Sequence, residues 1–313
     1  MAHPNVVNLA DLDERQLPGP ELRGRRVRVG PAAGAHRCGL SLYRLGPGER
    51  AMPVHVHADE EEHFFVLAGD GLSWQDGRTY RVSAGDCLVH LARGAAHTIV
   101  AGAQGMEVLA FGTGSDTGMT WLPRARAWWM GPHWIPSDGP DPFEAETLAG
   151  PLELPEPQDG PAPHSSSLAR ATERRSDRPG YRESHRRLAE EAGSARAGLH
   201  HATLAPGELS CPQHWHSAEE EAFVVLDGDG QALLDDETHP LRPGDVLWRP
   251  PGQGVAHALR AGGRGMTYLV FGTRVPDDYC FYPRSGKLNF AGVIFRPEPL
   301  DYWDGEAPAG PAA

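Results

Sequence analysis

Short runs of β-favouring residues, each closed by a glycine-rich turn, dominate the pattern of apolar and polar positions along the chain. Residues 64–67 (Phe-Phe-Val-Leu) and 223–226 (Phe-Val-Val-Leu) are both followed shortly by Gly-Asp-Gly. Apolar runs that end in such turns predict β-strands. Residues 98–100 (Thr-Ile-Val) are all β-branched and favour another strand.

Blocks of this sequence occur twice, in the same order. Residues 45–49 (Leu-Gly-Pro-Gly-Glu) return at 204–208 as Leu-Ala-Pro-Gly-Glu, an offset of 159 residues. Five blocks share this offset, and two later ones, ending with Phe-Gly-Thr at 111–113 and 271–273, share an offset of 160. Repetition at a fixed offset indicates an internal duplication, and therefore two domains of one fold.

Neither copy shows the sustained 3.6-residue periodicity of an amphipathic helix. Short strands separated by Gly- and Pro-rich turns are typical of a β-sandwich or barrel, and the 313 residues include 38 Gly and 29 Pro. We therefore expect an all-β chain with two tandem barrels joined by a partly disordered linker. The expected bounds are a first barrel over 25–124, an irregular segment and linker over 125–190, a second barrel over 191–275 and a tail over 276–306.

The segments outside the repeats differ in composition. Residues 125–150 contain three Trp and several Pro, which favours irregular packing against a barrel. Residues 151–180 are poor in large apolar side chains, so they predict a loose linker, followed by a short helix over 181–191. The tail is apolar enough to pack on a barrel or to extend the other copy's sheet, although residues 300–305 (Leu-Asp-Tyr-Trp-Asp-Gly) have no evident role.

Charge and composition exclude several classes of function. The net charge of −13 disfavours binding to nucleic acids and to anionic membranes. The four Cys are far apart in sequence, which argues against a disulfide framework. The chain lacks an apolar run of about 18 residues, and its first residues do not resemble a signal peptide. We expect a soluble cytoplasmic protein, a monomer or homodimer, that acts on a small molecule.

A group of potential metal ligands lies in the first copy. His55 and His57 are two residues apart, so on a strand both imidazoles project to the same face. Glu62 shares a face with two apolar residues of the following strand and is expected to point inward with them, whereas Glu61 points outward. His97 arrives from a later strand. Neutral imidazoles with one carboxylate suit a divalent transition metal ion.

The second copy repeats the whole set, as His214, His216, Glu221 and His257. A single His-x-His pair is usually incidental, and an acidic run is usually a solvated turn. Here the same four residue types occur twice in register, and burying them without an ion would be costly. The sequence therefore predicts two metal centres, each with Fe, Mn, Zn, Ni or Cu as possible ions.

Both copies resemble the cupin superfamily. Its first motif, G-x5-H-x-H-x(3,4)-E-x6-G, is matched through Gly69 in the first copy and Gly228 in the second, with the first glycine one residue further away in each. The second motif, G-x5-P-x-G-x2-H-x3-N, is matched more fully in the second copy, because Leu91 replaces the proline in the first. The resemblance implies tandem β-barrels, a bicupin, with a metal ion in each.

The resemblance leaves the reaction open, because cupins include oxygenases, isomerases, lyases, decarboxylases and binding proteins. Three His and one Glu leave two positions open on an octahedral ion, and we expect a dioxygenase-like oxygenase foremost. A Lewis-acid isomerase, lyase or decarboxylase and a non-catalytic binding module are the alternatives. Glu62 and Glu221 are the candidate catalytic proton acceptors. The fuller motif favours the second copy as the more active, and Arg284 in the tail is expected to form a surface ion pair or to hold an anionic substrate.

Overall fold

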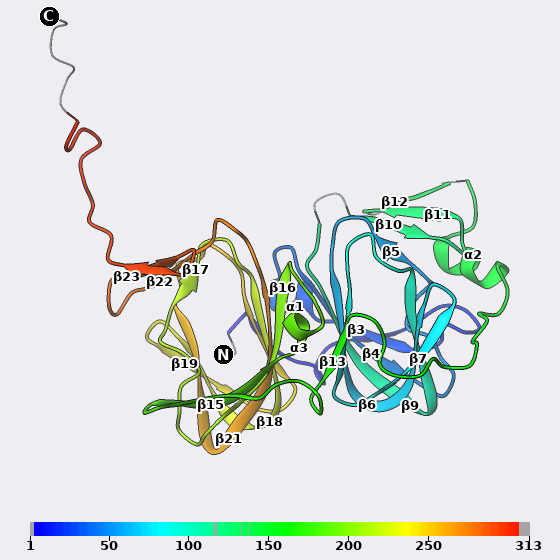
Figure 1. Cartoon of the computed structure of the whole chain (residues 1–313), viewed down its shortest axis with the longest axis horizontal. Coiled ribbons are helices and arrows are strands. Elements are labelled where there is room, and N and C mark those ends of the chain that lie inside the picture. Colours follow the sequence, from blue (N-terminus) through cyan, green and yellow to red (C-terminus); the bar gives the residue numbers. More distant parts are fainter. Residues whose placement is uncertain (1–2, 116–117, 132, 137, 307–313) are drawn as a thin grey trace, which may run out of the picture.

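Two long antiparallel strand pairs form where the repeated β-rich runs lie. In the first copy β6 (Glu62–Gln75) pairs with β9 (His97–Gly112), and in the second β18 (Glu221–Leu234) pairs with β21 (His257–Thr273). The computed structural model describes residues 3–115, 118–131, 133–136 and 138–306. Each long pair forms the centre of one eight-stranded sheet, and the two domains built on these sheets lie side by side (Figure 1).

The strands of the two large sheets follow equivalent orders. The first has the order β13 (Ser165–Ser167), β8 (Asp86–His90), β6, β9, β4 (Gly39–Leu45), β3 (Arg25–Arg28) and β2 (Glu14–Gln16), with β7 (Arg78–Ser83) on β6. The second has the order β1 (Val6–Asn8), β20 (Asp245–Arg249), β18, β21, β16 (Ala197–Leu204), β15 (Tyr181–Arg187) and β14 (Arg174–Arg178), with β19 (Glu237–Leu241) on β18. The strand pairs in the described ranges leave both sheets open at their edges rather than closed into a full ring.

A small four-stranded sheet accompanies each large one at the same end of the molecule (Figure 1). The first consists of β5 (Val56–His57), β10 (Met119–Leu122), β11 (Ala127–Met130) and β12 (His133–Ile135). The second consists of β17 (Trp215–His216), β22 (Tyr279–Tyr282), β23 (Lys287–Phe290) and β24 (Val293–Phe295). The helices are short: α1 (Gly30–Ala33), α2 (Pro142–Leu148) and α3 (Leu188–Glu191). In the described part of the chain, no helix has the length and apolar character needed to span a bilayer.

Each domain completes the other's sheet. The N-terminal strand β1 pairs with β20 of the second domain, and β13, which precedes the second domain, pairs with β8 of the first. One buried apolar cluster continues across the interface, where the rings of Phe111 and Phe271 stack with centroids 5.1 Å apart. The two phenylalanines are equivalent positions of the repeat, so the interface has approximate twofold symmetry.

The segment between the repeats is more ordered than its composition predicts. Residues 151–180 contribute β13 to the first large sheet and β14 to the second. Backbone groups hold the chain on the first domain before β13, as when Gln158 N donates to Thr79 O at 2.8 Å. Sheet edges therefore order this segment through backbone hydrogen bonds, a contribution that side-chain composition does not reveal.

The predicted helix over 181–191 is wrong for most of its length. Residues 181–187 form β15, which pairs with β14 on one side and β16 on the other, and only Leu188–Glu191 is helical. Strand partners on both sides satisfy the backbone of β15, and this tertiary pairing outweighs local helix propensity. In the tail, β22 pairs with β17 of the second copy and β23 pairs with β22, whereas Leu300, Tyr302 and Trp303 are exposed.

The glycine that ends the first motif has a steric role. Gly69 has φ +78°, and a Cβ atom placed there would lie 2.1 Å from the carbonyl oxygen of Gly105. Gly228 of the second copy has φ +84° and meets Gly265 O at the same 2.1 Å. The motif therefore needs glycine because β6 and β18 bulge against their neighbours at this point.

Gly69→Ala is expected to destabilise the protein by about 3 kcal/mol or more, since left-handed strain adds to a backbone clash. Gly77→Ala is the matched control: Gly77 has φ +79°, but no atom lies within 4 Å of the added Cβ. The control should lose only about 1–2 kcal/mol. Chemical denaturation of both variants checks this, and equal losses would contradict the steric explanation.

Candidate metal centre

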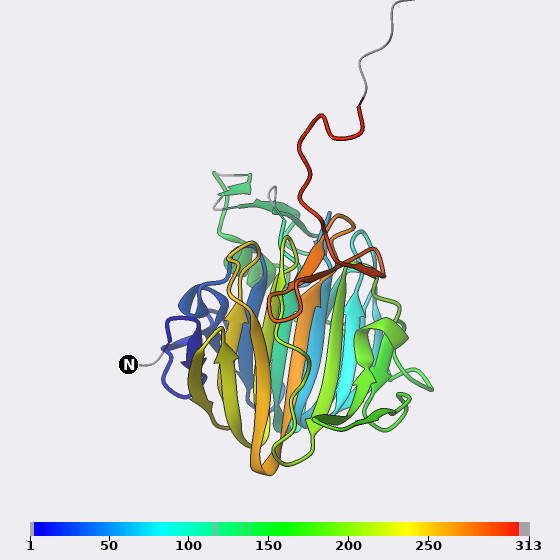
Figure 2. The ribbon, with the colours of Figure 1, turned by 90° about the vertical axis from the view of Figure 1, so that its left-hand side faces the viewer.

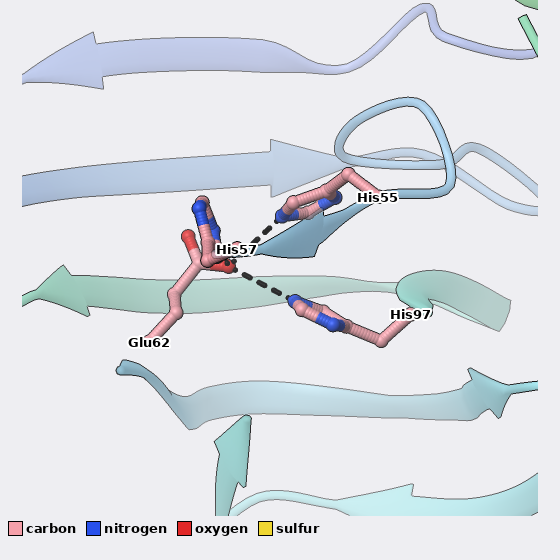
Figure 3. A group of neighbouring side chains, drawn as sticks. All are labelled: His55, His57, Glu62 and His97. Carbon is pink, nitrogen blue, oxygen red and sulfur yellow. Dashed lines mark hydrogen bonds and ion pairs between the residues drawn. The ribbon is translucent and has the colours of Figure 1, made fainter. Parts of the chain in front are cut away.

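The four predicted ligands of the first copy converge in the structure (Figure 3). His57 lies on β5, Glu62 begins β6, and His97 begins β9 and forms an isolated bridge with His55. One carboxylate oxygen, Glu62 Oε2, lies 3.2 Å from His55 Nε2, 3.2 Å from His97 Nε2 and 3.5 Å from His57 Nε2. Strand alternation and the antiparallel start of β6 beside β9 bring the residues together, as the spacing predicts.

The outer nitrogen of each imidazole already has a partner. His55 Nδ1 lies 2.9 Å from Pro53 O, and His97 Nδ1 lies 3.0 Å from Ala95 O. A carbonyl oxygen can only accept, so Nδ1 of both rings carries the proton and Nε2 presents a lone pair to Glu62. The nitrogen lone pairs and the carboxylate oxygen that they face repel each other unless a cation lies between them. The residues therefore fit a divalent metal ion, with the outer contacts fixing the ring orientation.

The electrostatics of the centre also indicate a need for positive charge. Burial raises the pKa of Glu62, but the three imidazoles beside it hold that pKa well below its ordinary value. Burial lowers the pKa of His57, yet hydrogen bonds with Glu60 and Glu62 raise it overall to about 10. Burial lowers the pKa of His97 to about 4. In the protein alone, a proton on His57 thus supplies the positive charge that an ion would supply.

Each residue of the acidic run 60–62 has a different role. Glu60 Oε1 lies 2.7 Å from His57 Nδ1 and orients that ring. Glu61 points away from its own domain, as predicted, but is buried at the interface, where it accepts hydrogen bonds from Ser194 Oγ at 2.6 Å and two backbone N–H groups. Glu62 faces the imidazoles. The run is therefore part of the interior and not a solvated turn.

The second copy brings its four predicted ligands together less tightly. His257 Nε2 lies 2.8 Å from Glu221 Oε2, and His216 Nε2 lies 3.6 Å from the same oxygen. His214 joins Glu221 and His257 in a set whose ligand atoms lie within 4.8 Å of one another. His216 Nδ1 is held by Asp278 Oδ2 at 2.7 Å, a contact that the repeats did not predict because Gly118 is the equivalent position.

A cavity opens onto the first centre. Its volume is about 200 Å³, and besides His55, His57 and Glu62 it is lined by Arg26 and Tyr43 and by apolar residues that include Trp129 and Phe143. The cleft at the second centre has a volume of about 10 Å³. The geometry therefore favours the first centre for substrate binding, in contrast to the preference for the second copy that the motif suggested.

Several residues around the first centre could not be found from the motifs. Arg26 lies on β3, far from the ligands in sequence, and its guanidinium carbon lies 5.4 Å from the centre of the Tyr43 ring. His90 stacks on His97 with ring centroids 3.6 Å apart, and burial keeps its pKa well below the ordinary value. The motif spacing marks the candidate ligands on or beside β5, β6 and β9, whereas Arg26 lies on β3 and His90 on β8.

Comparison with known proteins identifies the family. A family model described as "Cupin domain" matches residues 41–111 and again residues 200–271. The chain is a bicupin. The two matched ranges contain the eight predicted ligands, four in each. No curated protein matches the sequence significantly.

Solved structures similar to this bicupin include oxalate decarboxylases. The Lactobacillus farciminis enzyme in its formate complex has a TM-score of 0.60 and 19% identity, covering 87% of this chain and 87% of that chain. The Bacillus subtilis enzyme at pH 4.6 has a TM-score of 0.59 and 18% identity, covering 85% and 75%. Another Bacillus subtilis structure, from work on its Mn(II) centres, has a TM-score of 0.58 at 18% identity, covering 85% and 76%. At these identities the likeness shows the fold.

Proposed function

We propose that this bicupin is a metal-dependent enzyme that acts on a small carboxylic acid, with decarboxylase or lyase chemistry at the first centre. Our sequence-based preference for an oxygenase has less support, since the similar structures above are decarboxylases. The proposal depends chiefly on one observation: a guanidinium, Arg26, lines the small cavity that opens onto the His/Glu set.

The cavity is suited to a small anion. Its volume of about 200 Å³ is below the range of roughly 300–1,000 Å³ for drug-sized ligands. Arg26 Nε donates to Ser41 Oγ at 3.0 Å, which fixes the guanidinium and leaves its other N–H groups available for a carboxylate. Apolar walls that include Leu122 and Phe143 exclude water and strengthen that charge interaction.

The roles of the ligand residues follow from their contacts. His55, His57, Glu62 and His97 would hold a divalent ion, which when bound supplies a Lewis acid that polarises a substrate oxygen. Glu62 stays ionised because its pKa is held low, so it suits the role of a ligand better than that of a proton donor. Arg26 would orient the substrate. We propose the same ligand role for His214, His216, Glu221 and His257, with a non-catalytic second centre, because its cleft is so small.

The test is turnover by the metal-loaded protein on a panel of small mono- and dicarboxylic acids, with CO₂ release and O₂ uptake measured together. We expect CO₂ release without stoichiometric O₂ uptake. Arg26→Ala should raise KM by roughly tenfold to a hundredfold, because a charge-assisted hydrogen bond contributes about 1.5–3 kcal/mol. Arg25→Ala is the control, since Arg25 is exposed and pairs with Glu14 at 2.8 Å.

Two outcomes would contradict the proposal. One O₂ consumed for each product formed would establish an oxygenase. Stoichiometric metal without turnover across the panel would indicate a binding module.

A further inference from the structure

We propose that the C-terminal segment 297–306 folds over the second centre as α2 folds over the first, so that Trp303 becomes a wall of the second cavity. That wall function rests on the proposed binding role of the second centre, whereas the docking itself does not. In the structure this segment extends away from the sheets (Figures 1 and 2).

The first domain shows the closed arrangement. After the small sheet, the chain turns at Asp141 into α2, whose Phe143 lines the cavity of the first centre and lies 6.3 Å from the Trp129 ring. Glu146 of α2 is fully buried and accepts hydrogen bonds of 2.8 Å from Arg50 and Arg124. An aromatic ring and a buried ion-pair network therefore hold this helix over the site.

The duplication continues through these elements. β10 pairs with β11 as β22 pairs with β23, and β11 pairs with β12 as β23 pairs with β24, with every register pair offset by 160 residues. The same offset places Asp301 at Asp141, Trp303 at Phe143, Glu306 at Glu146 and Arg284 at Arg124. The number of residues between the third strand and the aspartate is also equal in the two copies, so the tail is long enough to reach the equivalent position.

The tail already has the local structure of a helix start. Asp301 Oδ1 accepts a hydrogen bond from Trp303 N at 3.0 Å, and in α2 Asp141 Oδ1 accepts one from Phe143 N at 2.8 Å. This contact is the N-cap that starts a helix. Trp303 is 70% exposed, which is unusual for a large apolar side chain in an ordered turn.

The receiving surface has matching groups. Arg284 is exposed and forms no ion pair within the part of the chain that the structure describes, so it is available for Glu306. Asn289 stands where Trp129 stands, and its buried Oδ1 has no hydrogen-bond partner among the described residues. The indole N–H of Trp303 is a donor of the right kind for that oxygen.

The second copy also differs in ways that weaken the closure. Leu209 stands at the position of Arg50, so Glu306 has one arginine partner instead of two. Gly305 replaces Ala145, which lowers helix propensity. We therefore infer a reversible closure, in which the extended tail and the docked tail exchange.

Hydrogen exchange of the full chain tests the docking without any metal. The amides of 303–306 should exchange at least about tenfold more slowly than in a free peptide of the same sequence. Arg284→Ala should reduce this protection about fivefold, which is the effect expected when one partly exposed ion pair is lost. Arg264→Ala is the control, because Arg264 is an exposed arginine that pairs with Asp229 at 3.0 Å.

The proposal would be overturned if the amides of 303–306 in the unaltered chain exchanged as fast as those of the free peptide. It would also be overturned if Arg284→Ala left their protection unchanged. Protection that disappears on dilution would also overturn it, since the tail would then be docking on a second copy.

Release of Zn²⁺ to a chelator tests the role of Trp303 at the second centre. The release phase that belongs to the second centre is the one that is absent in the His214→Ala/His216→Ala variant. Trp303→Ala should make this phase faster. Trp303→Phe, which has the aromatic residue of the first copy, should reverse most of the increase. An unchanged rate would overturn the wall function of Trp303. Absence of that phase in the unaltered chain would instead refute the metal role of the second centre, and hydrogen exchange would still decide the docking.

Discussion

Replacing His55 and His57 together with alanine is expected to remove about half of the bound metal and to abolish turnover. The two rings provide two of the three imidazoles that face Glu62 Oε2, so the remaining pair of residues cannot hold an ion tightly. Loss of a Lewis acid that contributes several kcal/mol should lower kcat/KM by roughly a thousandfold or more. Elemental analysis and turnover of the purified variant measure both effects.

The second copy provides the matched control for this variant. His214→Ala/His216→Ala should also remove about half of the metal, but should leave most turnover, because the cavity of about 200 Å³ lies at the first centre. Full metal content in either double variant would refute the two-centre hypothesis. Loss of turnover only in the second variant would assign catalysis to the copy that the motif favoured.

The sequence predicts the ligand sets because their geometry is local. His-x-His alternation on one strand and the inward face of Glu62 need only strand periodicity, and the duplication repeats the pattern in register. Residues of the cavity wall could not be predicted, because Arg26 and Phe143 reach the centre from elements that precede and follow the motif. Their approach depends on how β3 and α2 pack, which no spacing in the chain encodes.

The interface between the domains could not be predicted from the sequence either. Glu61 alternates with Glu62, so periodicity correctly directs it away from its own domain, but the surface it meets belongs to the other copy. The duplication makes this contact reciprocal: Glu220 accepts hydrogen bonds from the backbone N–H groups of 36–38 in the first domain. One residue of each acidic run thus faces a candidate metal centre while its neighbour joins the two domains.

Divergence between the copies supports a division of roles. The position of Arg26 is held by His185 in the second copy, and that of Tyr43 by Ala202. The guanidinium at the second centre belongs instead to Arg249, which lines a cleft of only about 10 Å³. The candidate metal ligands themselves are retained. Retained ligands with an altered cavity wall are what we expect if the second ion serves stability or regulation while the first serves catalysis.

Glu61→Ala is expected to destabilise the protein by about 3–5 kcal/mol, because it removes a buried charge that several donors share. The hydroxyl of Ser194 and the backbone N–H groups of Ala195 and Arg196 would lose their acceptor. Glu220→Ala should have a comparable effect from the other side of the interface. Glu14→Ala is the control, since its pairs with Arg25 and Arg44 lie at the surface and each contributes less than about 1 kcal/mol. Chemical denaturation compares the three variants.

The same contact predicts a dependence on pH. Burial raises the pKa of Glu61, but His63, Ser194 and two backbone N–H groups lower it overall from 4.5 to about 2. Because the folded-state pKa is the lower one, the stabilisation is complete above about pH 4.5 and is lost as the pH falls toward 2. Glu61→Gln, which keeps the shape without the charge, should lose this part of the acid sensitivity. The prediction for Glu61→Ala would be contradicted if its free energy of unfolding lay within about 1 kcal/mol of that of the unaltered protein. The apolar contact of Phe111 with Phe271 would then hold the domains together without this carboxylate.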